Sequence, residues 1–171
     1  YDDYEFRMIL DEVRMFRKLG ADGIVIGILN PDGTLNMEQM KALVEEAGDM
    51  GITLHRAFDV CRDPYEAMEQ CISLGIDTIL TSGQKSSAWE GRDLIKDLVK
   101  KSAGINPESI AKLAPYTNAK AYHMSGKVVI DSRMEFRREG VPMGIPGFSE
   151  FEIWQTSAEN IRKAVQVLQE L

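Results

Sequence analysis

The sequence has few of the residues from which several common kinds of protein site are built. Its 171 residues include two cysteines and two histidines. Two cysteines are too few for a disulfide framework and fit a reducing, cytoplasmic compartment. Neither Cys-x-x-Cys nor His-x-x-x-His occurs, so a closed zinc site is not indicated. The glycine-rich dinucleotide fingerprint is also absent, which counts against a nucleotide cofactor.

Positive charge and long apolar runs are scarce as well. The chain carries 20 Lys and Arg against 27 Asp and Glu, a net charge of −7. This balance provides no basic surface for nucleic acid. No apolar run approaches the roughly 20 residues of a membrane span, and the N-terminus does not resemble a signal peptide, so no membrane partner is expected. The chain starts at Tyr1 without an initiator methionine, and we expect the natural protein to begin upstream.

What the sequence does contain is a regular alternation of helical and strand patterns. Apolar residues at helical spacing alternate with short, β-branched apolar runs that predict buried strands. The repeat of about 25 residues per strand and helix predicts an α/β fold with a parallel sheet. Helices are predicted at 5–19, 37–47, 64–74 and from 89 or 91 to 101, and strands at 23–29, 52–58 and 78–81.

The alternation is interrupted after Lys101. Residues 102–105 lead directly to Asn106-Pro107, a helix cap followed by proline, so no strand is predicted between two helices. We interpret the interruption as a missing segment near 101–104. The remaining elements predicted are a strand at 120–126, a long polar segment with glycines and prolines at 127–155, and a helix at 158–168.

These elements predict a single domain, residues 1–171, with the (β/α)8 TIM-barrel fold. A complete barrel takes roughly 250 residues. The given chain would therefore lack the N-terminal strands and one internal strand of the barrel. An open, doubly wound sheet is the alternative.

Chemically active side chains gather where the second predicted strand ends. His55, Arg56 and Asp59 lie within five residues of one another, and folds with parallel strands build their sites at the carboxyl ends of those strands. A general acid or base, a fixed cation and a carboxylate are what catalysis on a small molecule requires. A buried ion-pair network is the equally open alternative.

Other predicted strand ends add to this candidate site. His123 is the second histidine near a strand end, where it could transfer protons. An equally open alternative is that it is a core histidine whose ring bonds to a backbone carbonyl. Small and hydroxyl residues at strand ends, together with a helix N-terminus after Gly104, could hold an anion such as phosphate. The candidate residues for binding this anion are Thr81, Ser82, Gly83, Gly104 and Ser125.

Soft metal ligands give a weaker signal. Cys61 follows the His55–Asp59 run and is a weak candidate ligand for a soft metal. Cys71 lies in a helical pattern and is interpreted as a small core residue. Thioether sulfur suits Cu(I), but most of the nine methionines lie on or beside predicted helices and are explained by packing.

Four runs of residues resemble the CutC family. They are Thr53–Asp59 (TLHRAFD), Ile79–Gly83 (ILTSG), Arg133–Arg137 (RMEFR) and the strand entry Gly20–Gly27 (GADGIVIG). The resemblance covers essentially the whole chain, in order. It implies a TIM barrel, a cytoplasmic location, a homo-oligomer such as a dimer or tetramer, and a role in copper homeostasis with Cu(I) as the metal.

The sequence also departs from the pattern of this family. Members carry an N-terminal portion with a Glu-Leu-Cys strand and an Arg-Pro-Arg-Gly-Gly loop, and neither is in this sequence. They also carry a strand ending in glycines before the Gly-Ile-Asn-Pro region, which coincides with the interruption near Gly104. The cysteines usually suggested to hold Cu(I) lie in that N-terminal portion, and Cys61 does not match their motif. Copper ligands are therefore not assigned to positions of this sequence.

Three functions stay open at this point. The first, from the resemblance, is cytosolic copper handling by Cu(I) binding or trafficking. The second is a TIM-barrel enzyme, of lyase, isomerase or hydrolase type, that acts on a small anionic metabolite. His55 and His123 would then be acid/base candidates and Arg56 the anion clamp. The third, a structural or interaction module, fits least well with so many polar residues at strand ends.

Overall fold

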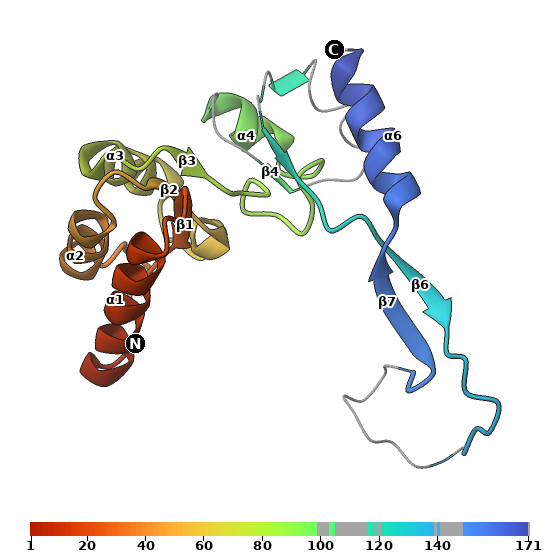
Figure 1. Ribbon diagram of the computed structural model, residues 1–171. Coiled ribbons are helices and arrows are strands. Elements are labelled where there is room, and N and C mark those ends of the chain that lie inside the picture. The colour runs from red at the N-terminus through yellow and green to blue at the C-terminus, as the bar shows by residue number, and fades with distance from the viewer. Residues whose placement is uncertain are drawn as a thin grey trace.

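The computed structural model describes residues 1–98, 103–104, 116–117, 119, 121–138, 140 and 149–170. Its fold is α/β, with parallel strands connected through helices, as the alternation predicts. Figure 1 shows three groups of elements along the chain. The first three strands lie with three helices, a second group contains the later short strands and two helices, and an antiparallel ribbon extends away from both.

The first group is a three-stranded parallel sheet in sequential order. Ile24 on the first strand lies opposite Ile52 on the second, and Leu54 lies opposite Ile79 on the third. The strands are β1 (Gly23–Ile26), β2 (Gly51–Leu54) and β3 (Thr78–Ile79), and the helices are α1 (Asp3–Lys18), α2 (Met37–Ala47) and α3 (Pro64–Leu74). The bounds of α2 and α3 are those predicted from the sequence.

Local capping groups explain where these helices begin and end. Asp2 and Glu5 form a capping box at the start of α1. Asn36 caps α2, and Asp63 caps α3 with Pro64 at its first position. Gly75 ends α3 in the left-handed conformation, with φ of 73°.

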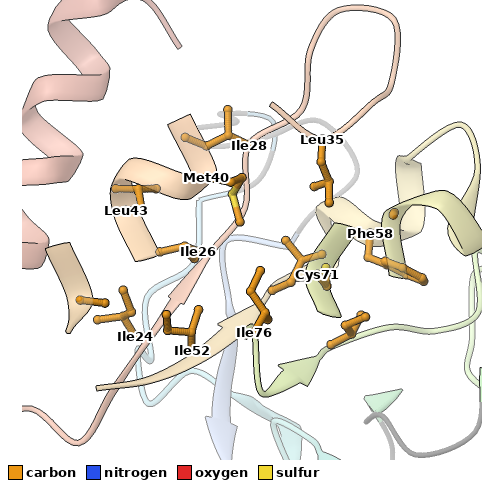
Figure 2. Close-up of a cluster of buried hydrophobic side chains, with 14 of the residues drawn as sticks. Ile24, Ile26, Ile28, Leu35, Met40, Leu43, Ile52, Phe58, Cys71 and Ile76 are labelled. Carbon is orange, nitrogen blue, oxygen red and sulfur yellow. The ribbon is translucent and has the colours of Figure 1, made fainter. Parts of the chain in front are cut away.

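One face of this sheet is buried against the helices. Ile24 and Ile26 point into the core, whereas Val25 points away from it and is 61% exposed. Figure 2 shows the strand side chains meeting Met40 and Leu43 of α2, with Phe58 and Cys71 at the other side of the cluster. The prediction that Cys71 is a core residue is confirmed, because its side chain is fully buried.

The strands are shorter than the sequence predicts. β1 ends at Ile26, and Leu29 instead forms an isolated antiparallel bridge with Leu35. β2 ends at Leu54 and is followed by the 3-10 helix η1 (Arg56–Val60). His55 is the N-cap of η1, because its Nδ1 accepts a hydrogen bond from the backbone N–H of Ala57.

The second group contains a strand where none was predicted. β4 (Ala103–Gly104) pairs in parallel with β5 (Tyr122–His123). The sequence predicted no strand between Lys101 and Asn106, and this prediction is wrong for Ala103 and Gly104. These two residues pair through backbone groups, so the strand does not require an apolar run. Helix α4 (Arg92–Asp97) lies within the predicted helix. The helix predicted to start at Pro107 lies outside the described residues.

The ribbon and the last helix complete the fold. β6 (Lys127–Asp131) and β7 (Glu152–Thr156) pair antiparallel inside the segment that was predicted to be irregular. The β-branched run at 128–130 favours a strand, but its partner lies more than 20 residues away and no short turn connects them. Helix α6 (Ala158–Gln169) begins after the Ser157 cap, as predicted.

Within the described part of the chain, none of the helices combines the length and the hydropathy that a membrane span requires.

Replacing Phe58 tests how η1 is anchored. Its side chain is fully buried, whereas Val60 on the same turn is 72% exposed. We expect Phe58→Ala to lower the free energy of unfolding by about 3–5 kcal/mol, because it leaves a cavity in the core. The control Val60→Ala should change it by less than about 0.5 kcal/mol. Urea denaturation measures both, and equal effects would contradict the packing described.

Candidate functional site

The carboxylate of Asp59 is the centre of a hydrogen-bond network that joins η1 to the loop after β3. Thr81 Oγ1 donates to Asp59 Oδ1 at 2.5 Å, and the backbone N–H of Gln84 donates to the same oxygen at 3.1 Å. The N–H of Ser82 lies 3.1 and 3.0 Å from the two oxygens. Arg56 Nε donates to Oδ2 at 2.7 Å. With 6% of its side chain exposed, Asp59 is a buried anion surrounded by donors.

The loop that surrounds this carboxylate has a strained conformation. Gly83 and Gln84 both have positive φ, 70° and 56°, and Gln84 is the one non-glycine residue with positive φ in the described chain. A Cβ atom on Gly83 would lie 2.2 Å from the carbonyl oxygen of Gly91, so only glycine fits at this position. Gln84 Nε2 donates to the carbonyl of Cys61 at 2.8 Å, which fixes the loop to the end of η1.

The network keeps Asp59 ionised. Burial by itself would raise the pKa of this carboxyl group. The hydrogen bonds from Thr81, Arg56 and the backbone of Ser82 and Gln84 outweigh burial and lower the pKa below its usual value. Asp59 is therefore suited to holding its neighbours in place, and its lone pairs are already used by donors from the protein.

Arg56 is held on one edge and open on the other. Its Nε binds Asp59, and its Nη2 donates to Ser82 Oγ at 2.7 Å. Ser82 Oγ lies 2.6 Å from the carbonyl oxygen of Lys85, to which it donates. Nη1 of Arg56 has no partner among the described residues, and the side chain is 57% exposed. A guanidinium group fixed in this way can bind an anion without reorganising.

Arg56 and Ser82 line a cavity of about 710 Å³ between the loop after β3 and the start of the ribbon. This volume is in the range of small-molecule sites. None of the described residues that line it is acidic, although the whole chain has a net charge of −7. The other lining residues are Leu80, Ser86, Ser87, Ala88, Trp89, His123, Met124, Ser125, Gly126, Lys127 and Asn160.

The structure brings together some of the residues predicted from the sequence. Arg56, Ser82, His123 and Ser125 line the same cavity. Thr81 is buried below it and bonds to Asp59.

The other predicted residues lie elsewhere. His55 does not line the cavity. Its imidazole packs on Gly27, where a Cβ atom would lie 2.6 Å from the ring, and it caps η1. Gly83 forms the turn beside Gly91. Gly104 lies in β4 opposite His123, and the helix expected after it is outside the described residues.

Several lining residues were missed by the sequence analysis. Ser86 and Ser87 lie a few residues after the predicted Ser82 and Gly83, and Lys127 lies two residues after Ser125, so a wider window at each strand end would have included them. Asn160 could not have been found in this way. It lies in the first turn of α6, and only the tertiary fold places it near Gly126, to whose carbonyl its Nδ2 donates at 3.4 Å.

The described residues do not form a metal centre. They contain no group of three or more His, Cys, Asp or Glu side chains that could hold an ion. Both cysteines are buried, and burial raises the pKa of the Cys61 thiol, which disfavours the thiolate that Cu(I) requires. Gln84 Nε2 also lies 3.4 Å from Cys61 Sγ. The thiols of this chain therefore do not fit a Cu(I) site.

Comparison with known proteins identifies the family. Residues 1–128 match the CutC family. A CutC family protein of Parabacteroides distasonis is 41% identical over 172 residues, which cover 95% of this chain and 71% of the relative. The chain belongs to the CutC family. A second member, from Pasteurella multocida, is 39% identical over 95% of the chain and 70% of its own length.

A solved structure supports the same assignment at the level of the fold. The crystal structure of CutC from Streptococcus agalactiae, named there as a proposed copper homeostasis protein, has a TM-score of 0.69 to this chain. It is 24% identical, and the match covers 72% of this chain and 65% of the S. agalactiae chain. This CutC-family chain thus spans about two thirds of that structure.

Replacing Asp59 tests its place at the centre of the network. We expect Asp59→Asn to lower the free energy of unfolding by about 3 kcal/mol at neutral pH, because a buried, charge-assisted network is broken. The pKa of Asp59 is lowered in the folded state, so its stabilisation is fully present above the unfolded pKa of about 3.9 and is lost as the pH falls through the folded pKa.

Urea denaturation at a series of pH values measures this effect. The difference between wild type and Asp59→Asn should shrink when the pH falls below about 3.9. Glu45→Gln, which removes an exposed carboxylate near Lys41, is the control and should have little effect at any pH. A difference that stays constant down to low pH would contradict the role given to the Asp59 charge.

Proposed function

We propose that this CutC-family chain binds a small anionic metabolite in the cavity lined by Arg56, Ser82, His123 and Lys127. The observation that carries the proposal is the composition of the lining. The described residues that line it include two cationic side chains, four serines and a histidine, and none of them is acidic, in a protein whose acidic residues outnumber its basic ones. A lining that carries cationic and hydroxyl groups and no acidic side chain favours an anionic ligand.

The side chains have different parts in this proposal. Arg56 presents Nη1 to the ligand while Asp59 and Ser82 hold its other edge. Serine hydroxyls can accept or donate, so they suit the oxygen atoms of a carboxylate or a phosphate ester. Asp59 itself is a positioning residue, because its oxygen atoms are occupied by donors from the protein.

An enzymatic use of the site would rest on His123. It is exposed and lines the cavity, so a bound ligand could exchange a proton with its imidazole. His55 is less suited, since its Nδ1 accepts from Ala57 and the ring is packed on Gly27. A lyase, isomerase or hydrolase that moves a proton on an anionic metabolite fits this arrangement.

The TIM barrel is our proposal for the complete fold. Three parallel strands follow one another in chain order, with helices on one face. The other face carries Val25, which is 61% exposed, as the inner face of an incomplete barrel would be. In a barrel the loops after β2, β3 and β5 would share the carboxyl end, and the cavity is lined from these loops. Residues 1–171 would then be one domain.

Copper homeostasis in the cytoplasm is the second candidate function. The name of the S. agalactiae structure favours it. The donor set of this chain does not, because Cys61 and Cys71 are buried and the described residues contain no ligand cluster. Cu(I) bound in trafficking would therefore have to be held by ligands other than these two thiols.

Replacing Arg56 tests the anion site. We expect Arg56→Gln to weaken the binding of inorganic phosphate by about 10- to 100-fold, because a charged hydrogen-bond donor is lost. Arg62→Gln is the matched control. Arg62 pairs with Asp32 and Glu66 outside the cavity, so its removal should leave the affinity unchanged. Isothermal titration calorimetry at low ionic strength measures both. Equal affinities of wild type and Arg56→Gln would refute the proposal.

A Cu(I) titration tests the second candidate. We expect the chain to compete poorly with a strong Cu(I) chelator under anaerobic conditions, and Cys61→Ser to change little, because the thiol is buried and protonated. Tight binding that disappears in Cys61→Ser would show instead that the chain handles copper through this residue.

A further inference from the structure

The cavity that contains Arg56 also has an apolar wall, which a simple anion would not use. Four of the described residues that line it are apolar, and they come from the residue after β3, from the segment before α4 and from the residue after β5: Leu80, Ala88, Trp89 and Met124. Sites for small molecules combine such walls with a few polar groups that fix the orientation of the ligand. The cavity therefore offers contacts to two chemically different parts of one ligand.

The apolar wall is packed from behind by a hydrophobic cluster. Ala88 is buried together with Ile95 of α4 and Ala164 of α6, and Met124 packs against this cluster. The shape of the wall is therefore set by packing within the protein. A surface formed in this way favours binding, because few side chains have to be ordered when a ligand arrives.

Trp89 is the largest apolar side chain of this wall, and its own neighbour holds it. The guanidinium group of Arg92 lies over the indole ring, 4.6 Å from the centroid, and Arg92 Nη1 donates to the backbone carbonyl of Trp89 at 2.8 Å. Arg92 is not among the described residues that line the cavity, so the indole borders the cavity with a part that Arg92 does not cover. Trp89 is 42% exposed. It thus presents a fixed aromatic surface to the cavity.

Tryptophan and methionine favour one kind of apolar group over others. An indole surface stacks with flat rings, which gain attraction beyond the burial of area. Thioether sulfur also makes favourable contacts with aromatic rings. Leucine and alanine alone would not distinguish a flat ring from an alkyl group of equal area. The combination of Trp89 and Met124 with the polar groups around Arg56 therefore favours a ligand that has a ring at one end and an anionic group at the other.

We propose that the ligand of this cavity is a ring-bearing anion, whose planar aromatic or heteroaromatic group lies on Trp89 while its carboxylate or phosphate group lies at Arg56. The inference rests on the anion site proposed above and adds the class of ligand. Arg56 contributes affinity for any anion, and Trp89 discriminates among anions by the group that they carry. The two contributions can be measured separately, because the indole has no charge.

Four phosphate monoesters of equal charge measure this discrimination. Methyl phosphate has little beyond the anionic group, and cyclohexyl phosphate adds an apolar ring that is not flat. Phenyl and 2-phenylethyl phosphate carry flat rings at two distances from the phosphorus atom. We expect the tighter-binding aromatic ester to have about tenfold higher affinity than methyl phosphate, and higher affinity than cyclohexyl phosphate. Isothermal titration calorimetry of the whole chain at low ionic strength measures all four.

Replacing Trp89 tests whether its ring is the source of the preference. Trp89→Ala should lower the affinity for the aromatic esters to about that for methyl phosphate, because the stacking surface is lost. Trp89→Phe keeps a flat ring and should retain most of the preference. Tyr4→Ala is the control, since it removes an exposed aromatic ring of α1 outside the cavity, and it should leave the preference unchanged.

The possible results separate this inference from the anion site itself. If all four esters bind equally well and Arg56→Gln weakens all of them, the anion site stands and the aromatic preference is refuted. A cyclohexyl ester that binds as tightly as the aromatic esters would also refute it, as would a preference that persists in Trp89→Ala. Binding of none of the esters would overturn both proposals.

Discussion

The buried carboxylate of Asp59 is the contact on which the geometry of the candidate site depends. Its partners come from η1 and from the loop after β3, and they include Arg56, Thr81 and two backbone N–H groups. A buried charge without these donors would be strongly unfavourable. The loop therefore adopts a turn that requires Gly83 and places Gln84 at positive φ. Strain in the backbone is offset by hydrogen bonds to the anion.

This arrangement determines which groups remain for a ligand. Of the residues predicted from the sequence to bind an anion, Thr81 and Ser82 donate hydrogen bonds to Asp59 instead. Arg56, which Asp59 orients, still has its Nη1 group available on the side of the cavity. The protein thus holds the carboxylate of Asp59 in the loop and leaves one edge of the fixed guanidinium group open to the cavity. The other polar residues of the cavity come from the loop after β3, from β5 and the loop that follows it, from the start of β6 and from the first turn of α6.

One face of the parallel sheet is open among the described residues. Val25 on this face is 61% exposed, whereas Ile24 and Ile26 on the other face are buried. Membership of the CutC family and the TM-score of 0.69 to the S. agalactiae protein place the sheet in a known fold.

Local interactions explain what could be predicted from the sequence. The bounds of α2 and α3, and the start of α6, follow from caps such as Asn36, Asp63 and Ser157, each of which bonds to a backbone group within three residues. The order of strands and helices follows from the spacing of apolar residues. The sequence likewise indicated that Arg56 and Asp59 belong to a site, since both follow a strand.

Only the tertiary structure decided the roles of these residues. Apart from Arg56, the partners of Asp59 lie 22 to 25 positions away along the chain, so no local pattern reveals that its oxygens are occupied. The two histidines looked alike in sequence, yet His55 caps a 3-10 helix and His123 lines the cavity. β6 and β7 are joined by a long connection, and Asn160 reaches the cavity through the packing of α6. The local sequence determines contacts between residues a few positions apart, such as helix caps. Contacts between distant segments depend on the tertiary fold, which no local pattern specifies.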